Sequence, residues 1–185
     1  MVRPPFQQLI DAQWREVAQV AAALVGPDDV DRYTQVAWER AVDQYRTLRP
    51  TRNLRGWLLS TAAKAIAEAQ RTGPDGTQGR PHSLGVPAQP TPPEPDEDVW
   101  ECVRQLPMQA RLALVLRYVA DLDHVCVAEA LNASPGATRR VVVEALEALR
   151  VRLRAELAVR DERTELSSAG VTTVVGAGDR GLPLG

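Results

Sequence analysis

The sequence predicts an all-α protein: two small helical domains joined by a flexible, Pro-rich linker. Three observations carry this prediction. Apolar residues recur at three- and four-residue spacing, Pro and Gly interrupt these runs, and no stretch alternates as a strand does. We expect a three-helix domain over 1–71 and a four-helix domain over 99–162, with the linker at 72–98 and a disordered tail at 163–185.

The first domain reads as three helices. An apolar stripe runs from Ile10 to Leu24, and Gly26-Pro27 ends this helix. The second helix covers about Asp29 to Tyr45. After a turn at Pro50, the third carries a stripe from Leu54 to Ala69.

The linker is marked by its composition. Residues 72–98 hold seven prolines, four glycines and five acids against Arg80, which gives a net charge of 1 − 5 = −4. Such a segment has neither helical nor strand periodicity, and it separates two helical blocks.

The second domain reads as four helices. The first covers about Glu97–Gln105, and Pro107 starts the next. A short helix follows at His124–Leu131. The last helix begins with Ser134 as its N-cap and Pro135 as its first residue.

The segment from Asp121 has the form of a helix-turn-helix, with its turn at Asn132. The first turns of the second helix of such a unit face the DNA major groove. We therefore expect DNA to be contacted by Ser134, Ala137, Thr138, Arg139 and Arg140. The alternative is a plain helical hairpin whose Arg139 and Arg140 form a solvated face.

A second set of basic residues surrounds the start of the third helix. The turn carries Arg46, Arg49, Arg52, Asn53 and Arg55, and the helix adds Lys64 and Arg71. Guanidinium groups bind phosphates, so a single strand can follow this cluster.

Composition excludes several classes. The chain has 185 residues, 44% of them apolar, and its net charge is 22 − 24 = −2. These values exclude wholesale disorder and bulk-charge coating of nucleic acid. No apolar run nears the ~20 residues of a membrane span and no signal peptide is evident, so we expect a cytoplasmic protein without membrane insertion.

Chemistry-bearing motifs are missing from the sequence. It holds no nucleophile–base pair, no Gly-rich phosphate loop and no metal-ligand spacing. We therefore expect no enzyme, no catalytic residue, no cofactor and no metal.

The second block carries four short motifs in a fixed order: Leu106-Pro107, Leu116-Arg117-Tyr118, Val127–Leu131 and Ser134–Thr138. With these motifs in this order, the block resembles domain 4 of an extracytoplasmic-function (ECF) sigma factor of bacterial RNA polymerase. The first block resembles domain 2 through VGPDDVDRYTQVAWERAVDQY and NLRGWLLSTAAKAIAEAQR. Together the blocks cover about 125 residues, with a linker between them as in the family.

The resemblance implies a non-catalytic specificity subunit that directs core RNA polymerase to promoters. Domain 2 would dock on the β′ clamp and melt the −10 element, while domain 4 would bind the β flap and read the −35 element. The implied polymerase contacts are Asp29, Asp31, Gln35 and Glu39. The implied DNA contacts are Arg52, Asn53, Arg55, Lys64 and Arg71, with Ser134, Thr138, Arg139 and Arg140. The resemblance leaves open whether an anti-sigma factor is a further partner.

The sequence departs from the family pattern at several of these positions. Arg32 stands where an acid is usual, Lys64 replaces an Asn, and Val141 and Glu144 replace arginines. Fewer phosphate contacts mean weaker DNA binding. The alternative is therefore a degenerate sigma-like protein that binds polymerase or a regulator without initiating transcription. An ordinary helix-turn-helix repressor or activator ranks last, because nothing resembles a dimerisation helix.

Overall fold

The computed structural model describes residues 4–49, 53–72 and 97–171. All regular structure within these ranges is helical, which confirms the predicted fold class. Most of the expected linker, and the end of the tail from residue 172, lie outside the described residues. The chain divides into two compact units, at Met1–Leu149 and Arg150–Gly185, and each is described by itself.

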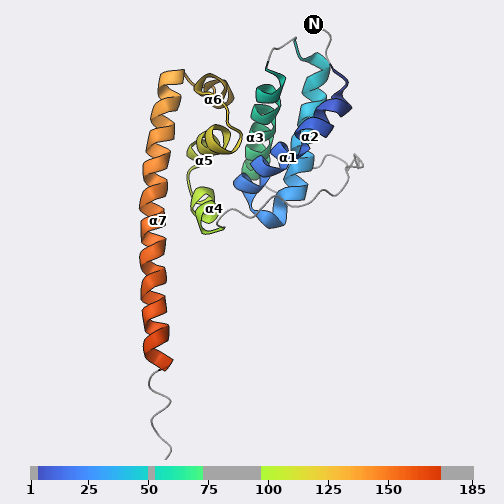
Figure 1. Ribbon diagram of the computed structural model, residues 1–185. Helices are drawn as coiled ribbons and strands as arrows, with labels where there is room; N and C mark the ends of the chain where they lie inside the picture. The colour runs from blue at the N-terminus through green and yellow to red at the C-terminus, as the bar shows by residue number, and fades with distance from the viewer. Residues whose placement is uncertain (1–3, 50–52, 73–96, 172–185) are drawn as a thin grey trace, which may run out of the picture. The chain divides into compact units, whose positions relative to one another are not determined.

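The first three helices lie where the sequence predicts them. They are α1 (Phe6–Val25), α2 (Val30–Thr47) and α3 (Leu54–Thr72), and a 3₁₀ turn η1 (Pro27–Asp29) joins α1 to α2 (Figure 1). Gly26 ends α1 with a φ of 91°, in the region that favours glycine, and its N–H donates to the Ala22 carbonyl.

Aromatic side chains from all three helices interlock in the first block. Trp14 of α1 stacks on Trp38 of α2 with ring centroids 5.9 Å apart, and Phe6 meets the same ring edge-on at 6.0 Å. Tyr45 packs between Phe6 and Trp57 of α3. Trp38 is 1% exposed, so this cluster fixes α1 and α3 against α2.

The second block contains α4 (Glu97–Arg104), α5 (Met108–Leu114), α6 (His124–Leu131) and the start of α7 (Pro135–Val171). The expected starts at Pro107 and Pro135 are both confirmed: Pro107 is the N-cap of α5, and Pro135 opens α7. A π-helical turn, η3 (Val115–Val119), directly continues α5, and no sequence pattern predicted it.

The two helical blocks share one hydrophobic core. Val115, Leu116 and Ala120 of the second block are buried in the same cluster as Val17 and Leu58 of the first. A smaller core, formed by Leu106, Ala113, Leu114, Val142 and Ala145, lies wholly within the second block. Within the first compact unit the blocks are therefore packed together rather than separate. The division into two domains by a linker stays a prediction.

The last helix is longer than expected. We expected helical structure to end near residue 162, but α7 continues to Val171. Residues 163–171, assigned to a disordered tail, are therefore helical. Their composition is poor in apolar residues, which is why no stripe marked them as helix.

None of the helices within the described ranges has the length and apolar character needed to cross a lipid bilayer.

Two glycines near helix starts give opposite predictions for the same substitution. A Cβ on Gly136 would meet nothing within 4 Å, whereas on Gly56 it would lie 2.5 Å from the Asn53 amide nitrogen. We expect Gly136→Ala to stabilise the protein by roughly 0.5–1 kcal/mol, because alanine favours helix. Gly56→Ala should cost about 1 kcal/mol, because it displaces the Asn53 cap. Urea unfolding measures both, and equal effects of the two variants would contradict the assignment.

Candidate nucleic-acid interface

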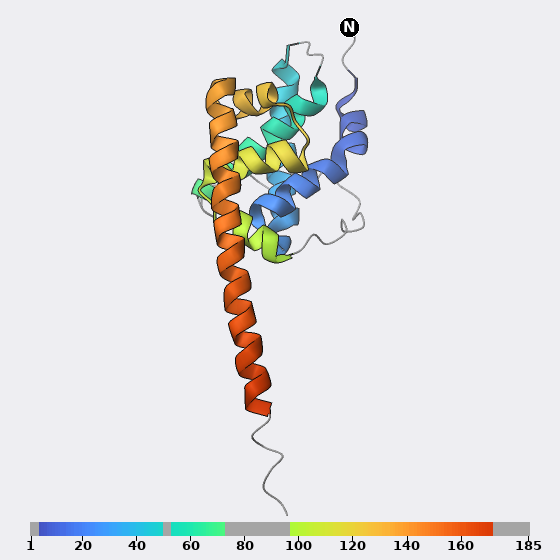
Figure 2. The same cartoon turned by 60° about the vertical axis from the view of Figure 1, so that its left-hand side comes forward.

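Helices α6 and α7 and the turn between them form a helix-turn-helix (Figure 2). Asn132 ends α6 in the left-handed conformation, with φ 51° and ψ 45°. The N–H of Ala133 then donates to the Ala128 carbonyl at 2.9 Å, which closes the turn. The predicted turn at Asn132 is thus confirmed. Asparagine suits this position, because its short side chain tolerates a positive φ.

The start of α7 presents polar groups to solvent. The Ser134 hydroxyl accepts a hydrogen bond from the Ala137 N–H at 3.2 Å, as expected of an N-cap. Ser134, Arg139 and Arg140 are all exposed. They are placed as a DNA-facing helix start requires, although DNA contact itself stays a prediction.

Thr138 does not share this exposure. Its side chain is 0% exposed, and its hydroxyl donates to the Ser134 carbonyl at 3.0 Å. The expected DNA contact by Thr138 is therefore corrected, because its side chain is buried within the protein at the first turn of α7. The sequence pattern could not separate Thr138 from Arg139 and Arg140, because these polar residues directly follow it and are exposed.

Asp123 fixes the start of α6. Its carboxylate accepts a hydrogen bond from the Cys126 N–H at 2.8 Å. This bond lowers the pKa of Asp123, because it favours the ionised form. The cap orients α6, which leads into the turn.

The start of α3 is a second polar site. Asn53 caps this helix, since its side-chain oxygen accepts from the Gly56 N–H at 2.8 Å. Arg55 is half-buried and pairs with Glu16 of α1. Arg52 lies outside the described residues.

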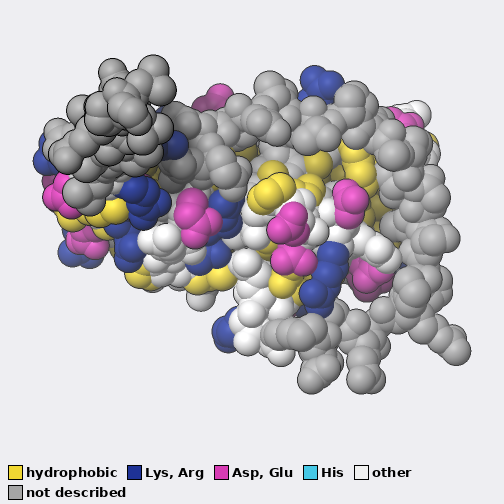
Figure 3. All heavy atoms as spheres, turned by 90° about the horizontal axis from the view of Figure 1, so that it is seen from below, with side chains coloured by type: hydrophobic (Ala, Val, Ile, Leu, Met, Phe, Trp, Pro, Cys, Tyr) yellow, Lys and Arg dark blue, Asp and Glu magenta, His cyan; other side chains and the backbone are white. Residues whose placement is uncertain are grey.

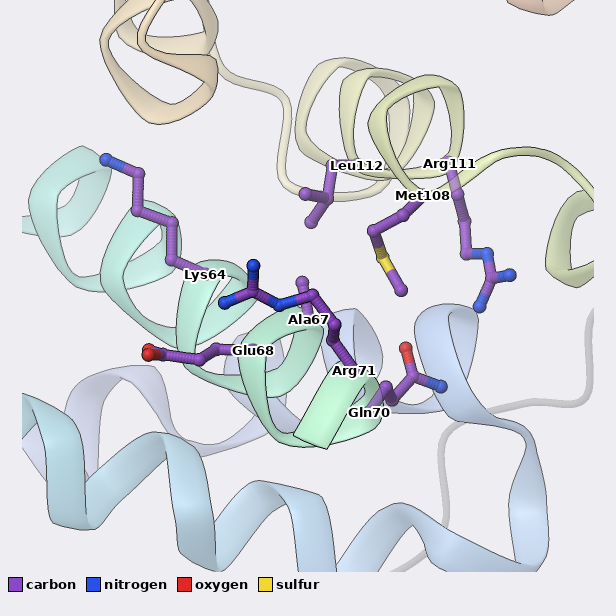
Figure 4. Close-up of a pocket in the computed structure, with 8 residues that line it drawn as sticks. All are labelled: Lys64, Ala67, Glu68, Gln70, Arg71, Met108, Arg111 and Leu112. Carbon is purple, nitrogen blue, oxygen red and sulfur yellow. The ribbon is translucent and has the colours of Figure 1, made fainter. Parts of the chain in front are cut away.

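Lys64 and Arg71 lie further along α3, and both are exposed. They line a cleft of about 730 Å³ whose other wall is α5, with Met108, Arg111 and Leu112. Figure 4 shows Arg71 and Arg111 approaching this cleft from α3 and α5 respectively.

Arg111 was not singled out from the sequence, yet it connects the two blocks. Its guanidinium donates to the Leu24 carbonyl at 3.1 Å and to the Leu106 carbonyl at 3.3 Å. Burial lowers the pKa of Arg111. Its position after Pro107 is visible in the sequence, but its partner on α1 is 87 residues away and leaves no local signal.

The expected polymerase contacts lie on or beside α2. Asp29 and Asp31 are exposed, while Gln35 and Glu39 are half-buried and joined by a hydrogen bond of 3.0 Å. Asp31, Gln35 and Glu39 are four residues apart, so they follow one face of the helix.

Charge on the surface is local rather than uniform. The face in Figure 3 shows Lys and Arg side chains among Asp and Glu side chains and apolar patches. This agrees with the net charge of −2, and any nucleic-acid contact depends on the clusters named above.

Comparison with solved structures identifies the architecture. The sigma factor RpoE in complex with the anti-sigma factor NepR from Bartonella quintana matches with a TM-score of 0.63 and 18% identity, over 80% of this chain and 96% of that one. CnrH in complex with the cytosolic domain of CnrY matches with a TM-score of 0.60 and 21% identity, over 81% and 88%. The chain has the fold of an ECF sigma factor. No family model matches the sequence, and no curated protein does so either.

The sigma-factor fold confirms the resemblance read from the helix-turn-helix and from the helices of the first block. In this fold the candidate residues form three sets: the acidic face of α2, the start of α3 with Lys64 and Arg71, and the start of α7. Arg55 and Lys64 also contact the second block, where they donate to the carbonyls of Ala120 at 2.9 Å and Glu129 at 3.2 Å.

The Asp123 cap makes stability depend on pH. A carboxyl whose pKa is lowered by folding stabilises the protein fully above its ordinary value of 3.8, and this stabilisation is lost as the pH falls through the lower folded value. Asp123→Asn keeps a capping oxygen but no charge. We expect the wild type to be the more stable near neutral pH, and the difference to shrink near about pH 3. Urea unfolding at both pH values checks this, and a gap that is the same at both contradicts it.

Proposed function

We propose that the protein is an ECF-type sigma factor that directs core RNA polymerase to specific promoters. The observation that carries the proposal is the helix-turn-helix in a sigma-factor fold, with Ser134, Arg139 and Arg140 exposed at the start of α7. A helix start of this kind presents free N–H groups and forked guanidinium groups to DNA. It makes α7 the reader of the upstream promoter element.

The first block supplies the polymerase contact in this proposal. Asp29, Asp31, Gln35 and Glu39 dock on the polymerase clamp through the acidic face of α2. Asn53, Arg55, Lys64 and Arg71, with Arg52, contact the strand that is separated near the start site. Anti-sigma factors are the partners named for RpoE, whose solved complex contains NepR, and one of that class is a further partner of this chain.

The direct test is transcription. Core polymerase supplied with this protein should give a defined run-off product on a genomic fragment that carries its promoter. Core polymerase alone is the control. The lack of any promoter-dependent product would contradict the proposal.

The DNA contact of α7 is tested by Arg139→Ala combined with Arg140→Ala. We expect promoter DNA affinity to fall roughly 10- to 100-fold, and the slope of log affinity against log salt to lessen by about 2. Arg150→Ala with Arg154→Ala is the matched control: it removes two exposed arginines from the same helix. An equally large loss of promoter DNA affinity in the control variant would show that net charge, and not the position of Arg139 and Arg140, determines binding.

The polymerase contact is tested by Asp31→Lys. A charge reversal in a complementary interface lowers affinity, and we expect core polymerase binding to weaken by about tenfold or more. Asp11→Lys makes the same charge change at an exposed position on α1. Equal binding by the two variants, measured by fluorescence anisotropy, would exclude the α2 face from the contact.

A second candidate is a sigma-like interaction protein that does not read DNA. Burial of Thr138 favours this candidate, because it removes one of the DNA contacts expected from α7. Glu144, which is exposed on the same helix, favours it too, because its carboxylate repels DNA phosphates. This candidate predicts that core polymerase is bound while Arg139→Ala with Arg140→Ala changes nothing. A loss of function in that double variant excludes it.

A further inference from the structure

The cleft between α3 and α5 carries more positive than negative charge. Among the described residues that line it, Lys64, Arg71 and Arg111 are cationic, whereas Glu68 is the one acid. Glu68 is already paired with Arg40 of α2, which does not line this cleft. Its charge is therefore largely compensated from outside, and the cleft keeps the positive charge of its three basic side chains.

These three cations have no carboxylate within ion-pair distance in the described part of the chain. Lys64 donates to the Glu129 carbonyl at 3.2 Å, and Arg111 donates to two backbone carbonyls. Arg71 makes no hydrogen bond to any described residue. Since a carbonyl oxygen carries only a partial charge, the full charges of the ammonium and the two guanidinium groups remain unbalanced.

Arg111 holds its charge at a partly dry position. Burial, and after it the nearby charge of Arg104, lowers the pKa of Arg111. Its Nε atom is buried and has no hydrogen-bond partner within the described ranges. A cation that has lost water without gaining a counter-ion is destabilised, so an anion bound in this cleft would stabilise it.

The walls of the same cleft are apolar. Figure 4 shows Met108 and Leu112 directed from α5 toward α3, where Ala67 lies, with the guanidinium of Arg71 nearby. A thioether packs well against the edge of an aromatic ring. The volume of about 730 Å³ is that of a small-molecule site, which ordinarily combines apolar walls with a few charged groups. The cleft therefore suits an anion that also has an apolar or aromatic part.

The basic groups favour phosphate as the anion. Two guanidinium groups and an ammonium together balance more than one negative charge, and a forked guanidinium matches the spacing of phosphate oxygens. A single carboxylate would leave most of the positive charge unbalanced.

We propose that this cleft is a binding site for a small organic phosphate. Arg71 contacts its phosphate groups, Arg111 supplies a second, fixed positive charge, and Met108 and Leu112 pack against its apolar or aromatic part. The site goes beyond the proposed function and does not rest on it. A single nucleic-acid strand is another source of the same phosphate chemistry, because Lys64 and Arg71 are also proposed to contact one, so the test includes both.

Calorimetric titration of the full chain at low salt is the first test. ADP is the probe, because it joins two phosphate groups to an aromatic base, and inorganic pyrophosphate and adenosine are its two parts. We expect ADP to bind several-fold more tightly than pyrophosphate, and adenosine not to bind measurably. The proposal is overturned if neither ADP nor pyrophosphate binds, or if both bind equally well, because the apolar walls then have no role.

Two neighbouring residues of α5 provide a matched pair of variants. Met108 lines the cleft and opens α5, where a helix favours an acid, so Met108→Glu adds a carboxylate to the cleft and keeps the helix. Gln109→Glu adds the same charge at an exposed position that does not line the cleft. We expect Met108→Glu to weaken ADP binding about tenfold or more, and Gln109→Glu to weaken it less than about twofold. Equal losses would contradict the proposed site.

Arg71→Ala covers the case in which Met108→Glu folds poorly, because Arg71 is exposed and bonds no described residue. Loss of a charge-assisted hydrogen bond should weaken ADP binding about tenfold. Arg15→Ala, which removes an exposed arginine from α1, should leave it unchanged. ADP binding that is the same in Arg71→Ala as in wild type would overturn the proposal.

A fluorescent single-stranded oligonucleotide distinguishes the two sources of phosphate. If the strand binds and Met108→Glu weakens it while ADP does not bind, the cleft belongs to nucleic acid and the small-molecule site is excluded. Run-off transcription by the wild type remains a separate readout: its failure would count against the sigma-factor role and not against the ADP site.

Discussion

The packing of both helical blocks on α1 is the constraint on which the rest of the structure depends. Val17, Val20, Ala21 and Leu24 of this helix are all 0% exposed, and no residue from Val17 to Val25 is exposed, so this half of α1 is covered on every side. On one side α1 packs against α2 and α3, and on the other against η3 and α4. Its position therefore sets both the start of α3 and the end of η3, where the polar contacts between the blocks occur.

Much of the fold could be predicted because its signals are local. Gly26, Pro107, Asn132 and Ser134-Pro135 act within one turn of their own positions, and the structure places helix ends at each of them. Apolar spacing then fixed which segments are helical. The fold class and the helix-turn-helix both followed from these signals.

The remaining features depend on residues far apart in the chain. The bonds of Arg55, Lys64 and Arg111 join residues 65 to 87 positions apart, and no short pattern reports such a pairing. Thr138 could not be distinguished from the exposed Arg139 and Arg140, because its burial depends on how the start of α7 packs on the rest of the second block. The candidate site was thus predictable as a set of residue types, whereas which of them are already engaged was not.

The contact between Lys64 and the Glu129 carbonyl has a practical consequence. Lys64 is the only lysine of the 185 residues, all other basic side chains being arginine or histidine. Its ammonium lies at the junction of α3 and α6. A reagent that acylates amines therefore labels one side chain of the chain, that of Lys64. A probe attached there would report on the contact between the first and second helical blocks.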